Sequence, residues 1–355
     1  MLRDTNGSAK APAPQGRGRI TKIVLRHSGR RRTSPAGARR GKAKVLVAHQ
    51  DDEAHVELPA YGFSDDLEEE LRGASISATV VADGLGAPQK AVGDNHLGRD
   101  ELWRTRRRES IKAAKKAGLS EITFLDYPSD VLRDVRIGQP TFDIQEDLTD
   151  GKDPYDALFT HSCFDRHPTH RSIFERAVKA CLMMPPEQRP RVLLAGEVWC
   201  DHEWVAEAWR VRFDISAGLR LARRVLRCFP SQTEVRPYHI GAAARWIAHA
   251  VYEDTHGVQN TRAVAYALNM TPLIQDPPMS LAEYIANVLA QSMFFDYPLL
   301  GVSSDDIRQA FSPMTFGSNF NSTVARRKNH AGNHLLQHRG RRSPSGNGHH
   351  RLASR

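Results

Sequence analysis

The sequence has little of what marks a membrane-spanning or a disulfide-stabilised protein. None of its apolar runs reaches the roughly 18 residues that suggest a transmembrane helix, and its N-terminal stretch lacks the apolar core of a signal peptide. Only four of its 355 residues are cysteine. No two of them form a Cys-x-x-Cys pair, so neither a zinc ribbon nor a redox motif is indicated. We therefore expect a cytoplasmic protein with reduced cysteines and no transmembrane segment.

Acidic residues are almost absent from both ends of the chain. Residues 1–44 contain 13 Lys/Arg and one acid, and residues 325–355 contain eight Lys/Arg and no acid. The ends therefore carry +12 and +8, so the residues between them carry −11 although the whole chain carries +9. Stretches rich in Gly, Ser, Pro and Arg but poor in apolar residues do not offset the entropy cost of ordering. We predict disordered basic tails over 1–43 and 322–355.

These tails have two interpretations. They are either solvated flexible arms or loose electrostatic contacts with nucleic acid or an anionic surface. No aromatic residues are interleaved with the arginines, so stacking on bases is not indicated. The acidic middle argues against a broad basic binding face elsewhere, so the tails alone would carry such binding.

Between the tails, β-branched apolar runs alternate with helical patterns. This alternation predicts an α/β fold, a Rossmann-like, mostly parallel sheet with helices on both faces. After about residue 213 the pattern is mainly helical. We expect one domain over 44–275, then a helical extension over 276–321. The predicted strands are 44–49, 75–84, 121–128, 154–162 and 191–199, and the main predicted helices are 65–73, 101–119 and 167–184.

Two groups of polar residues follow predicted strands. The stretch "AHQDDE" after the first strand places His49 and Asp52 three residues apart, and "HPTH" offers a further histidine ligand after the fourth strand. Carboxyl ends of parallel strands meet at one edge of a sheet, where His and Asp side chains can bind a zinc ion. A carboxylate that is not a ligand can then accept a proton. The alternative is charged surface, and we expect His55 and His161 to be bystanders.

The same stretches resemble a known family. "VLVAHQDDE" is similar to the A-H-P-D-D-E motif of the PIG-L/LmbE family of zinc-dependent N-acetylglucosaminyl deacetylases. The likeness continues in order through "VVADGLG", "RTRRRESIKAAKKAGLSEITFLDYPSD", "ALFTHSCFDRHPTHR" and the "FPSQ" at 229–232. The likeness spans about 44–270, and its motifs follow one another in the same order as in the family, so it is not confined to one motif.

The resemblance implies an enzyme that hydrolyses the N-acyl amide, as a rule N-acetyl, of an amino sugar or related conjugate. A zinc-bound water would be activated by a carboxylate, and zinc and a histidine would stabilise the oxyanion. The implied roles are one Zn²⁺ per chain on His49, Asp52 and His170, Asp51 as general base, His167 as oxyanion stabiliser or acid, and Arg106 and Asp130 as substrate contacts.

Two positions depart from the family pattern. Gln50 replaces a proline, which changes mainly the stiffness of the loop. Thr169 replaces an aspartate that orients the adjacent histidine, so we expect a lower pKa for His167 and altered chemistry.

Two other classes of function therefore stay open. The chain is either a catalytically altered LmbE-like binding or regulatory protein, or a protein that binds nucleic acid through its basic tails. The sequence does not name the substrate or the oligomeric state.

Overall fold

The computed structural model describes residues 20–25, 41–71, 73–86, 97–151, 153–253 and 261–292, with residues 301, 303, 305 and 306. The chain divides into two units, 1–294 and 295–355, and only the last four described residues fall in the second. The tail predicted over 322–355 lies outside the described residues, as does most of the tail predicted over 1–43. Within the described part of the chain, no helix is long and apolar enough to cross a membrane.

Eight strands form one sheet in the order β1-β4-β3-β2-β5-β6-β8-β7. The five central strands are parallel, and they correspond to the five that the sequence predicts. β1 and β8 run antiparallel to their inner neighbours, and β7 runs antiparallel to β8. The strands span Thr21–Val24 (β1), Lys42–Val47 (β2), Ser75–Ala82 (β3), Glu121–Tyr127 (β4), Ala157–His161 (β5), Val192–Gly196 (β6), Arg210–Asp214 (β7) and Val264–Asn269 (β8).

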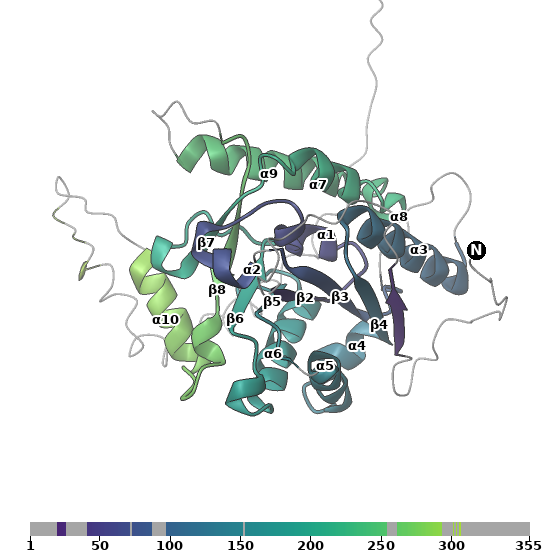
Figure 1. The fold of residues 1–355 in the computed structure, drawn as a ribbon, viewed down its shortest axis with the longest axis horizontal. Helices are drawn as coiled ribbons and strands as arrows, with labels where there is room; N and C mark the ends of the chain where they lie inside the picture. Colours follow the sequence, from purple (N-terminus) through teal and green to yellow (C-terminus); the bar gives the residue numbers. More distant parts are fainter. Residues whose placement is uncertain are drawn as a thin grey trace, which may run out of the picture. The chain divides into compact units, whose positions relative to one another are not determined.

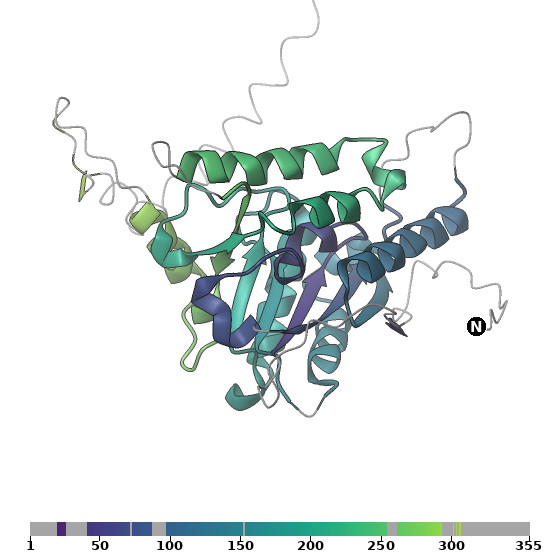
Figure 2. The ribbon, with the colours of Figure 1, turned by 45° about the horizontal axis from the view of Figure 1, so that its top comes forward.

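Helices cover both faces of the sheet, as the predicted α/β fold requires (Figures 1 and 2). The central strands are buried on both sides, which explains why they read as continuous apolar runs rather than as alternating ones. One core lies under α1 (Glu53–Val56), α3 (Arg99–Ala117), α7 (Leu219–Leu226) and α9 (Tyr238–Glu253). The other lies under α4 (Ser129–Arg133), α5 (Gln139–Thr149), α6 (Pro168–Leu182) and α10 (Leu281–Ser292).

The remaining short elements connect these layers. They are α2 (Glu68–Leu71), α8 (Pro230–Thr233) and five 3₁₀ turns: η1 (Leu58–Ala60), η2 (Asp65–Leu67), η3 (Pro186–Gln188), η4 (Glu207–Trp209) and η5 (Thr271–Leu273).

The structure corrects three expectations about where elements lie. Strand β1 lies inside the stretch 1–43 that we predicted to be disordered, and it pairs with β4. Strand β8 lies in the region predicted to be mainly helical, where it adds to the sheet beside β6, and β7, which ends where that region begins, was not predicted. Helix α10 was predicted within a separate extension over 276–321, yet it packs into the core of the first unit.

Helix α10 is fixed by one large side chain. Tyr284 is fully buried, its hydroxyl donates a hydrogen bond to the Asn269 carbonyl at 2.7 Å, and its ring meets Trp209 edge-on. We expect Tyr284→Ala to lower the free energy of unfolding by about 3–5 kcal/mol, because it leaves a cavity and an unpaired carbonyl. Urea denaturation measures this, and the exposed neighbour Glu283→Ala should change it by less than about 0.5 kcal/mol. A loss below about 1 kcal/mol for Tyr284→Ala would instead support an independent extension.

Candidate metal centre and active site

The predicted site residues follow two adjacent parallel strands. β2 ends two residues before His49, and β5 ends shortly before α6, which carries His170 in its first turn and has His167 at its N-cap. Because β2 and β5 pair in parallel, their carboxyl ends lie at the same edge of the sheet. His49 and His170 meet there although 121 positions separate them in the sequence. This is the edge at which open α/β sheets bind ligands.

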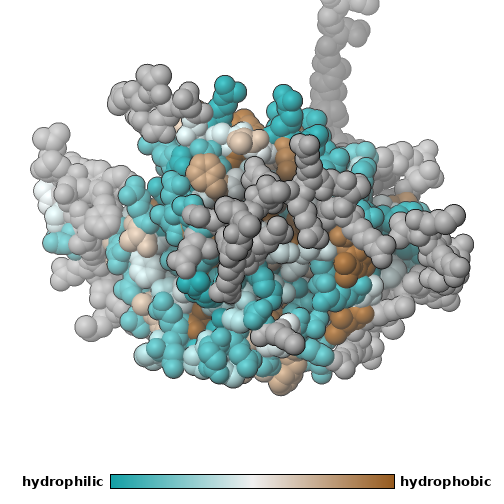
Figure 3. Space-filling model, viewed as in Figure 1, coloured by the Kyte–Doolittle hydropathy of each residue, from teal (hydrophilic) through white to brown (hydrophobic). Residues whose placement is uncertain are grey.

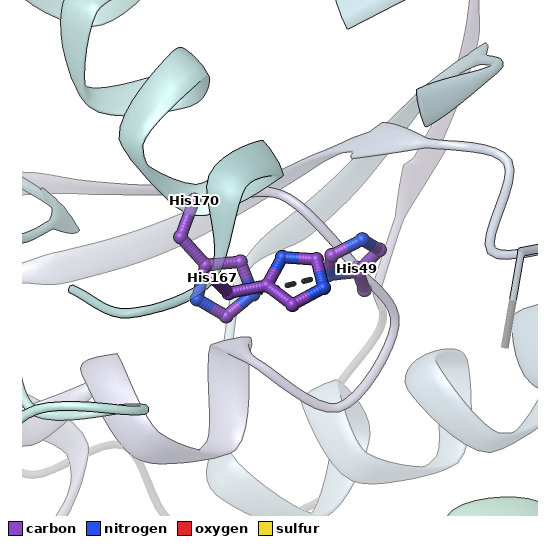
Figure 4. Close-up of side chains that lie close together, drawn as sticks. All are labelled: His49, His167 and His170. Carbon is purple, nitrogen blue, oxygen red and sulfur yellow. Dashed lines mark hydrogen bonds between the residues drawn. The ribbon is translucent and has the colours of Figure 1, made fainter. Parts of the chain in front are cut away.

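Three ligand-type atoms form a nearly equilateral triangle at this edge. His49 Nδ1 lies 3.1 Å from both Asp52 Oδ2 and His170 Nε2, and the last two atoms are 3.2 Å apart. Ligand atoms about 2.0–2.1 Å from a tetrahedral zinc ion are about 3.3 Å from one another. The triangle therefore fits one ion and leaves a fourth position open. Figure 4 shows the rings of His49, His167 and His170 gathered at this point.

The electrostatics of the triangle also favour a cation. Burial alone would lower the pKa of His170, but the carboxylates of Asp52 and Asp165 raise it to about 10. Burial opposes the ionisation of Asp52, yet His170 and His49 hold the pKa of that carboxyl well below its usual range. The residues therefore suit a divalent ion, which would take the place of the proton on His170.

Asp165 completes the site, although the sequence reasoning did not single it out. Its fully buried carboxylate accepts hydrogen bonds from His170 Nδ1 at 3.1 Å and from the backbone amides of His167 and Trp199 at 2.7 and 3.1 Å. Metal-binding histidines commonly donate their second ring nitrogen to a carboxylate, which fixes the ring and raises its basicity. The available signal was an acid two residues before the His-x-x-His pair, in "DRHPTH".

Among the residues that the structure describes, Thr169 makes no contact like the one that Asp165 makes with His170, and its expected effect on the chemistry stays a prediction. Thr169 is fully buried and its hydroxyl has no hydrogen-bond partner among the described residues, so it orients neither histidine. The expected lowering of the His167 pKa is present, to about 4, but burial and then the neighbouring His170 and His49 cause it. Position 169 has no acid, and Asp165 provides the carboxylate that orients His170.

We expect Asp165→Asn to weaken zinc binding by about 10- to 100-fold, because the amide leaves His170 without its charged partner. Competition against a chromophoric chelator measures the affinity. Thr169→Val is the matched control, since it removes a buried hydroxyl that has no partner among the described residues. Its zinc affinity should stay within about twofold of the unaltered protein, because no hydrogen bond is lost. Equal losses in the two variants would argue against the role of Asp165.

Asp51 stands beside the triangle in a strained backbone conformation. Its φ of 121° lies in the region that non-glycine residues rarely adopt. Its carboxylate accepts a hydrogen bond from Arg106 at 2.9 Å, and its side chain keeps 18% of its surface exposed. Burial raises the pKa of Asp51 well above its usual range, against the opposing charge of Arg106. A carboxyl tuned upward beside a metal position is suited to accepting a proton.

Arg106 has a different place from the one predicted. Its side chain is buried, and its two terminal nitrogens donate to the backbone carbonyls of Gln50 and Gly84 and to the Asp51 carboxylate. The guanidinium thus positions the loop and the base, so the expected substrate contact finds no support in its geometry. Helix α3 carries both Arg106 and Glu109. The Glu109 carboxylate accepts two hydrogen bonds from Ser231, which hold the helix in position.

Gln50 joins the same arrangement. Its amide donates a hydrogen bond to the Ala82 carbonyl at 3.0 Å, which links the loop after β2 to the end of β3. A Cβ on Gly84 would lie 2.0 Å from Gln50 Oε1, and the φ of Gly84 is +73°, so glycine is required there. The replacement of proline therefore adds a specific link between two strand ends rather than only a softer loop.

Two further predictions concern Asp130, expected to contact the substrate, and His161, expected to be a bystander. Asp130 is exposed in the first turn of α4, where its carboxylate accepts the backbone amide of Val131, and no contact brings it to the triangle among the described residues. His161 lies 3.6 Å from Asp52, but its Nε2 already accepts the backbone amide of Ala48 at 2.8 Å. The lone pair of that nitrogen is thus engaged, although His161 with Asp52 and His170 forms another group whose ligand atoms could hold a metal ion. That His161 is a bystander therefore stays a prediction.

Comparisons with known proteins give one family match. The family model described as PIG-L, GlcNAc-PI de-N-acetylase, matches residues 44–181. A comparison with curated protein sequences gives no match.

Similar solved structures include both deacetylases and a hydratase. The N,N'-diacetylchitobiose deacetylase of Pyrococcus horikoshii has 15% identity and a TM-score of 0.48, over 65% of this chain and 84% of that one. The 4-carboxy-2-hydroxymuconate hydratase GalB of Pseudomonas putida has 16% identity and a TM-score of 0.47, over 64% and 95%. A deacetylase from the biosynthesis of teicoplanin has 13% identity and a TM-score of 0.47, over 64% and 97%. The reaction therefore has to be argued from this chain's own side chains.

Proposed function

We propose that this protein is a zinc-dependent hydrolase of N-acyl amides, because the family model described as PIG-L, GlcNAc-PI de-N-acetylase, matches residues 44–181. Its substrate would be an amino sugar or a related small-molecule conjugate, and the acyl group would be acetyl. The observation that carries the proposal is the triangle of His49, Asp52 and His170 with the Asp51 carboxylate beside it. We infer one zinc ion per chain and a cytoplasmic enzyme.

The residues of the triangle fit a metal position with one open side. A bound divalent ion supplies positive charge that polarises the amide carbonyl and eases the deprotonation of water. His49, Asp52 and His170 would hold it. Asp165 would keep His170 in the tautomer whose Nε2 faces the ion, because its carboxylate engages the Nδ1 hydrogen.

Asp51 is the group that receives the proton of the attacking water. Arg106 holds its carboxylate at 2.9 Å, while the exposed part of the side chain leaves room for water. As the water oxygen bonds to the amide carbon, Asp51 gains one proton. When the C–N bond breaks, that proton passes to the leaving nitrogen, and a carboxylic acid and a free amine are the products.

His167 is placed to act on the carbonyl oxygen. Its half-buried ring lies 5.0 Å from the ring of His49 and 4.5 Å from that of His170, centroid to centroid, and its Nδ1 has no partner among the described residues. A ring nitrogen in this position can donate a hydrogen bond to the oxyanion that develops on the amide.

The test is to load the full chain with zinc and offer it a panel of N-acetylated amino sugars and their conjugates. Release of free amine and of acetate in equal amounts supports the proposal. Zinc bound at one ion per chain without turnover on any amide of the panel would overturn the hydrolase and favour an LmbE-like binding or regulatory protein.

A further inference from the structure

Two neighbouring helices on one face of the sheet expose basic side chains almost without acidic ones. On α3 the exposed charged side chains are six Lys/Arg and Glu101, and α7 with the residue after it exposes four arginines and no acid. Arg99, at the start of α3, pairs with Asp83 at 3.6 Å, and we call the other nine basic residues the basic face. Its members are Arg104, Arg108, Lys112, Lys115, Lys116, Arg220, Arg223, Arg224 and Arg227.

The charges of the basic face are continuous across the helices. Cys228 lies just after α7, and burial raises the pKa of its thiol. The charges of Lys116 and Lys112 oppose that rise, so these two residues of α3 lie near the end of α7. Burial and then Arg227 and Arg223 lower the pKa of His239, at the start of α9. Helix α7 packs on both α3 and α9, and Figures 1 and 2 show the three helices on the same side of the sheet.

Helix α9 adds an apolar stripe to this side. Ile240, Ile247 and Val251 are 60%, 41% and 58% exposed, and Tyr252 beside them is 65% exposed. Spacings of seven and four residues place the first three on one face of a helix. In Figure 3, hydrophilic side chains stand along the upper edge, where Figure 1 shows α7 and α9, with apolar side chains among them.

We propose that the basic face and the stripe of α9 together dock on the surface of an anionic lipid bilayer. Clustered Lys/Arg side chains are attracted to anionic headgroups, and apolar side chains next to them enter the boundary between headgroups and acyl chains. The helices of the opposite face expose both signs, with acids at Glu146, Glu175 and Glu283 and basic residues at Arg133, Arg171 and Lys179. The excess of positive charge on the side of α3 and α7 favours one orientation of the protein on the membrane.

This surface corrects an expectation drawn from composition. The net charge of −11 between the tails suggested that no broad basic face exists there, but the fold gathers nine exposed Lys/Arg side chains on α3, α7 and the residue after α7. A nucleic acid would also bind the basic face, yet phosphate contacts need no exposed Ile and Val beside them. The stripe of α9 is therefore the observation that favours a bilayer.

The experiment measures co-sedimentation of the full chain with phosphatidylcholine vesicles, with and without phosphatidylglycerol. We expect binding only to the anionic vesicles. The double variant Arg223→Glu and Arg224→Glu should bind at least about tenfold more weakly, because each basic residue near the surface contributes substantially. The matched control, Arg133→Glu and Lys179→Glu, makes the same charge change on α4 and α6 and should bind as the unaltered chain does.

A second pair of measurements separates a bilayer from a nucleic acid. Ile240→Ser with Val251→Ser leaves the charge unchanged and should weaken binding to the anionic vesicles several-fold, since it removes apolar area from the contact. Fluorescence anisotropy with duplex DNA should show no change for this variant. The proposal is overturned if the chain does not bind anionic vesicles, if both charge variants weaken binding equally, or if the two serine substitutions leave vesicle binding intact.

Discussion

Replacing Asp51 by asparagine is expected to lower kcat/KM for amide hydrolysis by about 10²- to 10⁴-fold while zinc stays bound. Asparagine keeps the shape of the side chain and its tolerance of positive φ, which the backbone at this position requires. It also lets the amide oxygen accept the hydrogen bond of Arg106. What it removes is the ability to take a proton from water, so the loss isolates that step.

The measurement is initial-rate kinetics of amine release with the zinc content determined on the same samples. Asp66→Asn makes the same chemical change on the exposed turn η2 and should leave the rate unaltered. A variant of Asp51 that kept more than about a tenth of the activity would remove this residue from the role of base.

His170→Ala should empty the metal position. The substitution removes one of three ligands together with the group that links Asp52 to Asp165. Zinc content measured by mass spectrometry should fall from about one ion per chain to a small fraction, and activity should fall with it. A folded variant, checked by circular dichroism, that retained its zinc would contradict the ligand assignment.

The variant His167→Ala distinguishes the proposed ligands, His49, Asp52 and His170, from a set of three histidines. The ring nitrogens of His49, His167 and His170 also lie within 4.8 Å of one another, so a three-histidine centre is the competing arrangement. If Asp52 is the third ligand, His167→Ala keeps its zinc and loses turnover. An empty site in this variant would assign His167 to the metal instead of to the carbonyl oxygen.

The parallel part of the fold was predictable because its signals are local. Continuous apolar runs mark β2, β3, β4, β5 and β6, and long helical patterns mark α3 and α6. β7 and β8 are at least as long as β5 and β6 but were missed, because they belong to the sheet only through antiparallel pairing. That pairing is a tertiary contact, and it overrides the weak local preference of a sequence such as "VAYALN".

The candidate site shows the same division between local and distant information. His49, Asp51 and Asp52 could be recognised because they follow one strand directly. Asp165 was not singled out, because its place two residues before the His-x-x-His pair is only a weak signal and the contact of its buried carboxylate with His170 is seen only in the fold. Arg106 was assigned to the substrate on the family resemblance. Its bonds to the carbonyls of Gln50 and Gly84 could not be predicted, because they depend on how α3 lies across two strand ends.

Strand β1 has a practical consequence for anyone who shortens this protein. Because it pairs with the outer edge of β4, removing residues 1–43 as though they were only a tail would uncover a row of backbone amides and carbonyls. Exposed edges of this kind recruit strands from other molecules and start aggregation. A shortened protein whose first residue lies before Ile20 keeps β1. If a protein that lacks β1 is insoluble, the exposed edge of β4 accounts for it, and the result says nothing about the charge of the tail.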